Sequence, residues 1–318
     1  MAIDHGTETG NGLTIVIPAY RCARYLSATV RSALACGGAQ IIISEDAGGD
    51  DTLAVARQMR DQNPERITLI ENPKNLGMTG NWRSAFGRVG TPWVLKLDGD
   101  DLINPAYVAA AMAFVRTRPD IGVLAGRIEN IGADDYLEAA PAASGPVPAE
   151  AFDTFEGVAA LQLCLRWLPV PCSSSMIFRM AVYRQVGGFD ALLGDWGPDR
   201  EIWFRISRVA PVAMCNRPAV YYRTLPTSIT AATGRADRQC YGYSRMLHIA
   251  AEQWHEPEAR KLLRLAFIHA SGSFVKSAWR AVRRGRAEEV PGRIAHGAAD
   301  LYRAVAPRRQ HDFNGCQS

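Results

Sequence analysis

Three carboxylates, Asp98, Asp100 and Asp101, lie within four residues of the short stretch VLKLDGDDLIN at positions 94–104. Apolar residues precede and follow them, so the carboxylates stand at the end of a run that a protein would bury. Carboxylates this close repel one another and raise one another's pKa. Such a cluster can bind a divalent cation or a hydroxyl-rich ligand. A solvated acidic turn before a helix that starts at Pro105 is the alternative.

The residues before this turn alternate between apolar runs and helical patterns. Strands are predicted at residues 13–20, 41–44, 66–72 and 92–101, and helices at residues 23–36, 53–62 and 81–89. This β-α-β-α-β-α-β order predicts an α/β fold, in which helices flank a Rossmann-like, mostly parallel sheet.

Polar side chains follow all four predicted strands. They are Tyr20, Glu45, Asp46, Asn72, Asn75 and the carboxylates of residues 98–101. Ligands of such sheets bind beyond the carboxyl ends of the strands, so we expect these side chains to form one site. The first turn, IPAYRCARY, lacks G-x-G-x-x-G, and G-x-x-x-x-G-K-[ST] is absent from the chain. These absences disfavour a dinucleotide enzyme and a P-loop NTPase.

The composition is that of a globular protein, with 47% hydrophobic and 21% charged residues. The formal net charge of +4 does not indicate a nucleic acid as partner. Residues 231–318 carry 15 Lys and Arg against 8 Asp and Glu, a net charge of +7, so the remainder carries −3. Seven scattered cysteines without C-x-x-C spacing indicate reduced thiols. The polar first residues and the absence of a long apolar run predict a cytoplasmic protein, soluble or peripheral at the membrane.

The remainder of the chain predicts a helix at residues 105–119, strands at 121–132 and 219–224, and a mobile loop at 132–152. From residue 241 to residue 290 the pattern is helical. An appended helical region is therefore expected at the C-terminal side.

Four stretches carry a family resemblance: TIVIPAY at 14–20, IIISEDAGGDDT at 41–52, LKLDGDD at 95–101 and VGGFDALLGDWGPDREIWFRI at 186–206. In order and spacing they resemble the opening strand, the DDGSxDxT turn, the DxD motif and the GGFDE and (E/D)DxxLWxR segment of the family 2 glycosyltransferases, which have the GT-A fold. The resemblance covers residues 13–228. It implies a GT-A domain over residues 1–230, with a nucleotide-sugar half at about 13–104 and an acceptor half at about 105–230. A basic helical extension over residues 231–318 would follow.

The resemblance implies inverting transfer of a sugar from a UDP- or dTDP-sugar to a hydroxyl of a glycan, glycolipid or small molecule. The usual setting is the assembly of cell-surface polysaccharide or glycolipid, or of secondary metabolites. A divalent cation, Mn²⁺ or Mg²⁺, would neutralise the departing diphosphate. Within the motif Asp98–Gly99–Asp100, Asp98 would hold the ribose hydroxyls or the metal. Asp100, with Asp101 near it, would face the metal.

The resemblance also implies a pocket for the nucleobase. Asp46 would accept the N3–H of uracil, and Glu45 replaces the first Asp of the family's pair. Tyr20 would stack on or beside the base, while Pro18 and Ala19 shape the loop. A turn-forming role for Asp46 and a core-edge role for Tyr20 are the alternatives.

Further donor contacts are implied at Asn75 and Gly77, which match the family's N-x-G loop beside the ribose and phosphates. The stretch YYRTLPTS at 221–228 resembles the family's YRxHxxS segment. Leu225 stands at the histidine position, so no histidine ligand is offered there. Arg223 would contact the diphosphate, or would form a structural salt bridge.

Asp199 matches the second acid of the (E/D)D pair, where the family has the general base that takes the proton of the acceptor hydroxyl. Pro198 replaces the first acid of the pair. Asp195 and Glu201 are competing bases, and a helix cap is the structural alternative for Asp199.

The basic C-terminal helices could contact a membrane surface or form a homodimer face. For the whole chain, the departures at Glu45, Pro198 and Leu225 leave open a non-catalytic module that binds nucleotide sugars. A nucleotidyltransferase shares the sheet, but the loop after the first strand lacks the GxGxR-type pattern of that class.

Overall fold

The computed structural model describes residues 12–136, 145–165, 172–193, 197–225, 236–283 and 287–305. The chain divides into two compact units, Met1–Thr233 and Gly234–Ser318. None of the described helices combines the length and the apolar content that crossing a bilayer requires. The division of the first unit into a donor half and an acceptor half stays a prediction.

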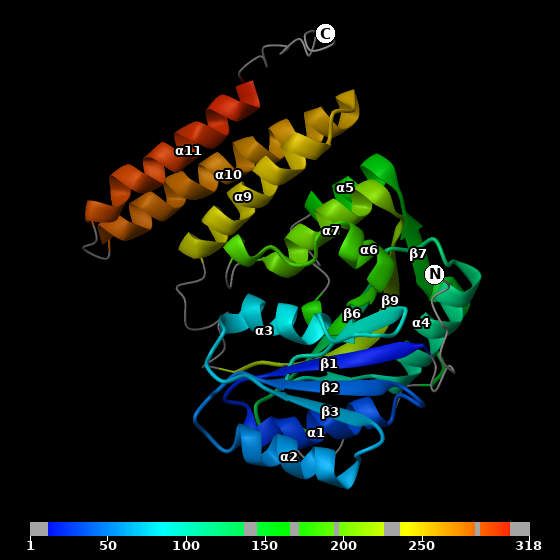
Figure 1. The fold of residues 1–318 in the computed structure, drawn as a ribbon. Coiled ribbons are helices and arrows are strands. Elements are labelled where there is room, and N and C mark those ends of the chain that lie inside the picture. Colours follow the sequence, from blue (N-terminus) through cyan, green and yellow to red (C-terminus); the bar gives the residue numbers. More distant parts are fainter. Residues whose placement is uncertain are drawn as a thin grey trace, which may run out of the picture. The chain divides into compact units, whose positions relative to one another are not determined.

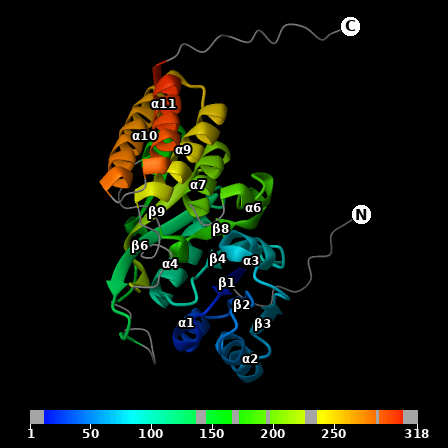
Figure 2. The same cartoon turned by 90° about the vertical axis from the view of Figure 1, so that its left-hand side faces the viewer.

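The four strands predicted in the first hundred residues pair in parallel, in the spatial order β3-β2-β1-β4 (Figure 2). Their bounds are β1 Leu13–Ala19, β2 Gln40–Glu45, β3 Ile67–Glu71 and β4 Trp93–Lys96. Every residue of β1 is buried, because helices cover both faces of this central strand. Figures 1 and 2 show α1 and α2 on one face and α3 on the other. These helices are α1 Ala23–Leu34, α2 Thr52–Gln62 and α3 Gly77–Phe86.

Beyond β4 the sheet becomes mixed. In the described part of the chain nine strands form one sheet, whose order continues from β4 through β8, β6 and β9 to β5, with β7 paired to β9. Their bounds are β5 Leu102–Ile103, β6 Val123–Ile131, β7 Phe152–Phe155, β8 Ile177–Arg179 and β9 Val212–Arg223. Strand β8 runs antiparallel to β4 and β6, whereas β6 and β9 are parallel. The predicted α/β class is confirmed.

The loop predicted at residues 132–152 is only partly a loop. A 3₁₀ helix at Ala149–Ala151 leads directly into β7, which begins at Phe152. Phe152 packs against Phe114 of the helix α4 (Pro105–Thr117), with ring centroids 4.6 Å apart. This packing explains the strand, because it buries an aromatic side chain that the Ala- and Pro-rich sequence around it does not predict. Residues 137–144 lie outside the described residues.

Four more helices lie in the described residues of the first unit. They are α4 Pro105–Thr117, α5 Gly157–Leu165, α6 Met180–Gln185 and α7 Pro198–Val209. Helix α4 begins at Pro105, as predicted, and the side chain of Asn104 caps it by accepting the backbone N–H of Ala106 at 3.0 Å. Short 3₁₀ helices lie at Ser173–Ser175 and Ala191–Leu193.

In its described residues the second unit contains α9 Ala236–Gln253, α10 Pro257–Arg283 and α11 Val290–Val305, with a 3₁₀ turn at Ala287–Glu289. The C-terminal helical region is therefore present. Inside the unit, Asp300 accepts a hydrogen bond from Ser244 Oγ at 2.7 Å and lies 3.2 Å from His248 Nε2. This buried polar cluster joins α11 to α9.

Gly126 lies where the pairing of β6 with β9 shifts register. A Cβ added there would lie 2.4 Å from the Cβ of Ala219 and 3.0 Å from Cε2 of Tyr107. We expect Gly126→Ala to lower the free energy of unfolding by about 1–3 kcal/mol, the usual cost of overpacking. Urea denaturation followed by circular dichroism measures the effect. Gly90→Ala is the matched control, because a Cβ there meets no atom within 4 Å; equal midpoints for the two variants would contradict the expectation.

Candidate functional site

The loops that follow β1, β2 and β4 are joined by backbone hydrogen bonds. The N–H of Asp46 donates to the carbonyl of Ala19 at 3.0 Å, and the N–H of Cys22 donates to Thr52 Oγ1 at 2.9 Å. The N–H of Leu97 donates to the carbonyl of Val16 at 2.9 Å. The carboxyl ends of these strands therefore form one edge, as the β-α alternation requires.

Gly99 sits where the acidic turn meets the loop after β1. A Cβ added at Gly99 would lie 2.7 Å from Sγ of Cys22 and 3.1 Å from the carbonyl oxygen of Pro18. The hydroxyl of Thr29 donates to the carbonyl of Gly99 at 3.0 Å. Any larger residue would push the carboxylates away from the edge, so the glycine of the motif has a steric function here. Pro18 and Ala19 are buried in β1 and shape the other wall of this contact.

Asp98 is held by one cation and two hydroxyls. Lys96 Nζ pairs with Oδ1 of Asp98, and the hydroxyls of Ser173 and Ser174 donate to Oδ2 at 3.2 and 2.8 Å. Burial opposes ionisation of Asp98, but Lys96 and the two serines outweigh it and lower the pKa of this carboxyl. Asp98 is therefore a fixed anion at the sheet edge.

The side chain of Lys96 has no exposed surface. Its Nζ lies 3.9 Å from the ring centroid of Trp82 and donates to Ser173 Oγ at 2.8 Å. Sequence reasoning missed both Lys96 and the serines of CSSSM. One signal was available, namely a lysine in the middle of the otherwise apolar run VLKL.

Asp101 is turned into the protein and is 1% exposed. The hydroxyl of Ser174, which also contacts Asp98, lies 2.5 Å from its Oδ2, and its Oδ1 accepts the backbone N–H of Arg223 at 2.8 Å. Burial, and next the charges of Asp100 and Asp98, raise its pKa well above the usual value. These contacts tie the acidic turn to β9, so a structural function explains the position of Asp101, which was predicted beside the metal.

Asp100 differs from its neighbours because no described side chain donates a hydrogen bond to it. It is half-buried, and burial together with the charge of Asp98 raises its pKa to about 6. A carboxylate pair with one unsatisfied member is the environment that a cation stabilises.

Within the described ranges, no group of three or more His, Cys, Asp or Glu side chains is arranged to hold a metal ion. Of the three predicted carboxylates, Asp101 is buried against β9, whereas Asp98 and Asp100 are only partly buried. This donor set still fits Mg²⁺ or Mn²⁺, which bind hard oxygen ligands and retain positions for phosphate oxygens and water. The metal function of these residues stays a prediction.

Asp46 is 2% exposed and stands at the base of the predicted nucleobase pocket. Its Oδ1 accepts Asn72 Nδ2 at 3.1 Å and the backbone N–H of Leu76 at 2.9 Å. Among the described residues, Oδ2 of Asp46 has no donor. Tyr20 is 45% exposed, and the guanidinium of Arg21 lies 5.2 Å from its ring centroid. One buried acceptor and one exposed aromatic ring thus lie on neighbouring loops.

Glu45 uses both carboxylate oxygens to close its own turn. Oε2 accepts the N–H of Ala47 at 3.0 Å, and Oε1 accepts the N–H of Gly48 at 2.8 Å. Ala47 has a φ of +52°, a strained value for a residue with a Cβ. Both oxygens thus hold the turn, and the predicted donor contact of Glu45 stays a prediction.

Asn75 and Gly77 form the turn before α3. Asn75 is exposed, and its Oδ1 accepts the N–H of Gly77 at 2.8 Å. Gly77 has a φ of +73°, which glycine adopts at no steric cost. Their contact with a donor stays a prediction.

Arg223 is 1% exposed and lies beneath the acidic turn. Its guanidinium donates to the carbonyls of Asp100, Gly132 and Asp135 at 2.8, 3.0 and 2.6 Å. It also lies 4.8 Å from the ring centroid of Tyr25. The side chain therefore braces three backbone segments, whereas the sequence predicted a contact with the diphosphate or a salt bridge.

Asp199 is the second residue of α7 and follows Pro198. Gly197, which precedes the helix, has a φ of +69°. Its Oδ1 accepts the N–H of Arg200 at 2.9 Å. Burial raises the pKa of Asp199, while the charges of Lys96 and Arg200 lower it and that of Asp98 raises it further. Asp199 thus shares an electrostatic environment with the acidic turn, although 98 residues separate it from Asp101 in the sequence.

Glu201, a competing base, is buried without exposed surface. It forms an ion pair with Arg205, which also donates to the carbonyls of Val186 and Gly188. Glu201 therefore holds the Gly187–Gly188 turn against α7. Asp195, the other competitor, lies outside the described residues.

The description "Glycosyltransferase like family 2" belongs to a family model that matches residues 11–242. The putative glycosyltransferase EpsE of Bacillus subtilis (strain 168) is 27% identical over 110 residues, which are 34% of this chain and 40% of that protein. An uncharacterized glycosyltransferase, alr2836, of Nostoc sp. is 24% identical over 213 residues, 66% of this chain and 64% of that protein. The chain spans less than two thirds of the length of these curated relatives.

The fold is similar to that of S. aureus TarS 1-349 in complex with UDP-GlcNAc, with a TM-score of 0.67 and 16% identity over 92% of this chain and 81% of that chain. Such low identity supports the fold alone. Since the family model matches well over half of the sequence and the mixed sheet has the GT-A architecture, the chain belongs to the glycosyltransferase-like family 2.

Proposed function

We propose that the protein is an inverting, metal-dependent glycosyltransferase that moves a sugar from a UDP- or dTDP-sugar to a hydroxyl acceptor. The observation that carries the proposal is a set of three carboxyl groups in different environments: Asp46 and Asp100 at the sheet edge, and Asp199 at the start of α7, within the electrostatic influence of Lys96 and Asp98. Asp46 retains an acceptor oxygen, Asp100 accepts no hydrogen bond from a described side chain, and Asp199 has a raised pKa. The family membership and the UDP-GlcNAc complex of TarS support the donor class.

The donor would lie along this edge with its base at Asp46 and Tyr20. The free oxygen of Asp46 suits the imide N–H of uracil or thymine, and the exposed ring of Tyr20 suits stacking. Guanine also presents an N1–H, so discrimination against it depends on the size of the pocket. A mannosyltransferase of Pyrobaculum calidifontis, solved with GDP-Man and Mn²⁺, has a TM-score of 0.54 and 15% identity over 92% of this chain and 85% of that chain.

At the diphosphate, Asp98 and Asp100 would hold Mg²⁺ or Mn²⁺, which supplies positive charge for the leaving group when bound. Asp98 is already compensated by Lys96, so the net charge that the pair offers a cation is close to one negative charge at neutral pH. Two carboxylates leave most coordination positions to phosphate oxygens and water. This arrangement suits a cation that arrives with the donor.

Asp199 would act as the general base. As the acceptor oxygen forms its bond to the anomeric carbon, the bond from that carbon to the phosphate oxygen breaks, and Asp199 takes the hydroxyl proton. One attack from the face opposite the leaving group inverts the configuration. A raised pKa improves a carboxylate as a base near neutral pH, provided that the carboxylate remains ionised.

The second candidate function is a non-catalytic module that binds nucleotide sugars. Two departures favour it: the carboxylate oxygens of Glu45 accept hydrogen bonds from their own turn, and Leu225 replaces the family's histidine. Incubation of UDP-GlcNAc and other UDP-sugars with the protein discriminates the two. An enzyme releases UDP slowly into water, and a binding module binds the sugar nucleotide without releasing UDP.

Metal dependence is tested by calorimetry with UDP. We expect tighter binding in Mn²⁺ or Mg²⁺ than in EDTA, and we expect Asp100→Asn to remove most of this difference, because the variant loses the carboxylate that lacks a donor. Asp120→Asn is the control, since that exposed carboxylate pairs with Arg118. Equal affinity for UDP in both buffers would refute the metal-dependent reading.

The general base is tested with Asp199→Asn. The amide is nearly isosteric but cannot take a proton, so turnover should fall by about 10²–10⁴. UDP affinity should remain within a few-fold, because Asp46 and the acidic turn bind the donor. A variant that retains more than about a tenth of the wild-type rate would exclude the role, and a parallel collapse of UDP binding would favour a structural role in α7.

The charge of Lys96 predicts that its removal shifts the pH dependence of kcat/KM. Activity needs ionised Asp199, so kcat/KM should fall as pH drops through its raised pKa. Lys96 lowers this pKa, and Lys96→Met should therefore move the acidic limb to higher pH. Arg88→Met, at an exposed position, should leave the limb unchanged. Circular dichroism checks that both variants fold. If a folded Lys96→Met protein keeps the acidic limb of kcat/KM at the wild-type pH, the electrostatic effect of Lys96 on Asp199 is contradicted.

A further inference from the structure

Helix α10 carries a stripe of exposed apolar side chains. Its members, called the α10 stripe, are between 46% and 61% exposed, and they are Leu265, Ile268, Val275, Trp279 and Val282. With Gly272, where an added Cβ would meet no atom within 4 Å, the positions follow one another at intervals of three or four residues. This spacing places them on one face of the helix.

The opposite face of α10 builds the interior of the second unit. Phe267, Ala270 and Phe274 are at most 3% exposed. His248 of α9 stacks on Phe267, and His296 of α11 stacks on Phe274. The α10 stripe is therefore not needed for packing within the unit. Eight of the thirteen large apolar side chains that are exposed in the described residues lie on α10 and α11, so the exposure is concentrated there.

Cations flank the α10 stripe along its length. Lys261, Arg264, Lys276 and Arg283 are exposed, and the guanidinium of Arg283 lies 4.9 Å from the ring centroid of Trp279. The sequence of α10 contains six Lys and Arg but one acid, Glu258. Apolar surface bordered by basic side chains with long aliphatic stems is typical of helices that lie in a membrane interface.

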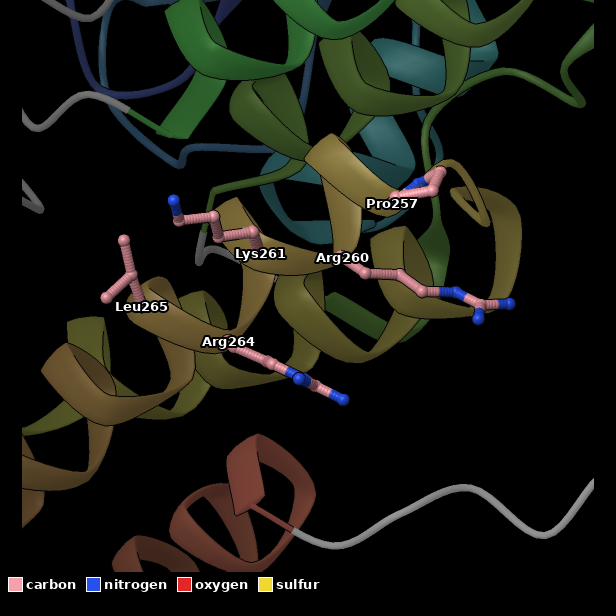
Figure 3. A pocket seen from close by; sticks show the side chains of 5 residues that line it. All are labelled: Pro257, Arg260, Lys261, Arg264 and Leu265. Atoms are coloured by element: carbon pink, nitrogen blue, oxygen red, sulfur yellow. The ribbon is translucent and has the colours of Figure 1, made fainter.

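At the N-terminal end of the stripe lies a hollow of about 500 Å³, lined by Pro257, Arg260, Lys261, Arg264 and Leu265 (Figure 3). Arg260 and Arg264 extend to one side of the helix, and Lys261 and Leu265 to the other. Leu265 belongs to both the hollow and the stripe. A cluster of three basic side chains therefore adjoins the apolar surface, an arrangement that suits an anionic group attached to an apolar chain.

A second copy of the chain fits this surface poorly. Pairing two α10 stripes, in either direction, would bring Arg264, Lys276 and Arg283 against the same cations of the other copy. Glu258 alone cannot compensate them. Like charges opposed across an interface weaken association, so the partner must supply negative charge along the full length of the stripe.

We propose that α10 docks the protein on an anionic lipid bilayer, with the α10 stripe among the head groups and upper acyl chains and the flanking cations against lipid phosphates. The inference goes beyond sugar transfer and does not depend on it. It adds an attachment surface to a chain in which none of the described helices can cross a membrane.

Co-sedimentation of the full chain with vesicles tests the proposal without any sugar nucleotide. We expect binding to phosphatidylcholine vesicles with about 30% phosphatidylglycerol, weak binding to pure phosphatidylcholine, and loss of binding as salt screens the charges. Arg264→Glu/Lys276→Glu and Trp279→Ser/Val282→Ser should each lower the partition coefficient about tenfold or more.

Two control variants make the same kinds of substitution in the first unit. Arg88→Glu/Arg116→Glu makes the same change in net charge, and Ile128→Ser/Val209→Ser removes exposed apolar groups of the first unit. Both should bind vesicles like the wild type, and circular dichroism checks that all four variants fold. Equal binding to neutral and anionic vesicles, or wild-type binding by folded stripe variants, would overturn the proposal. So would a lipid-free dimer that Trp279→Ser/Val282→Ser abolishes, which would assign the stripe to a second copy.

Discussion

Lys96 places one positive charge inside the sheet, where Asp98, Ser173 and the face of Trp82 surround it. A buried ammonium without a partner costs several kcal/mol, so the ionised form of Asp98 and the closeness of β4 to the CSSSM segment are mutually dependent. Removing either charged group would leave the other buried without its counter-ion. The acidic turn is therefore fixed by electrostatics from below, and its outer carboxylate, Asp100, remains available.

The carboxylates near the edge fall into two groups, according to how many of their oxygens accept a hydrogen bond. Glu45, Asp101 and Glu201 have both oxygens bound and hold loops, strands or turns in place. Asp46 and Asp100 retain unbound oxygens in the described residues and so can meet a ligand. The backbone concentrates strain at the same place, because Arg21 and Ala47 both have positive φ. Such strain persists only where the surrounding contacts enforce it.

The sequence predicted the parallel half of the sheet well, because β1 and β2 are continuous apolar runs whose burial on both faces leaves one interpretation. It also located the edge, since topology alone brings the carboxyl ends of β1, β2 and β4 together. The function of each carboxylate was less predictable. Whether Asp101 faces a ligand or the interior depends on Ser174, which is 73 residues away, and no local pattern encodes that contact. Strand β7 was missed for the same reason, because its burial comes from Phe114.

Arg223 has a mechanical consequence. One planar guanidinium holds the carbonyl of Asp100 on the acidic turn and those of Gly132 and Asp135 in the loop after β6. A guanidinium is rigid and its hydrogen-bond directions are fixed. Arg223 therefore couples the positions of these backbone segments. A molecule that displaces the loop at residues 132–136 would also displace the backbone at Asp100. A ligand bound at that loop would thus affect the position of Asp100 through backbone carbonyls, without any contact with the side chain of Asp100 itself.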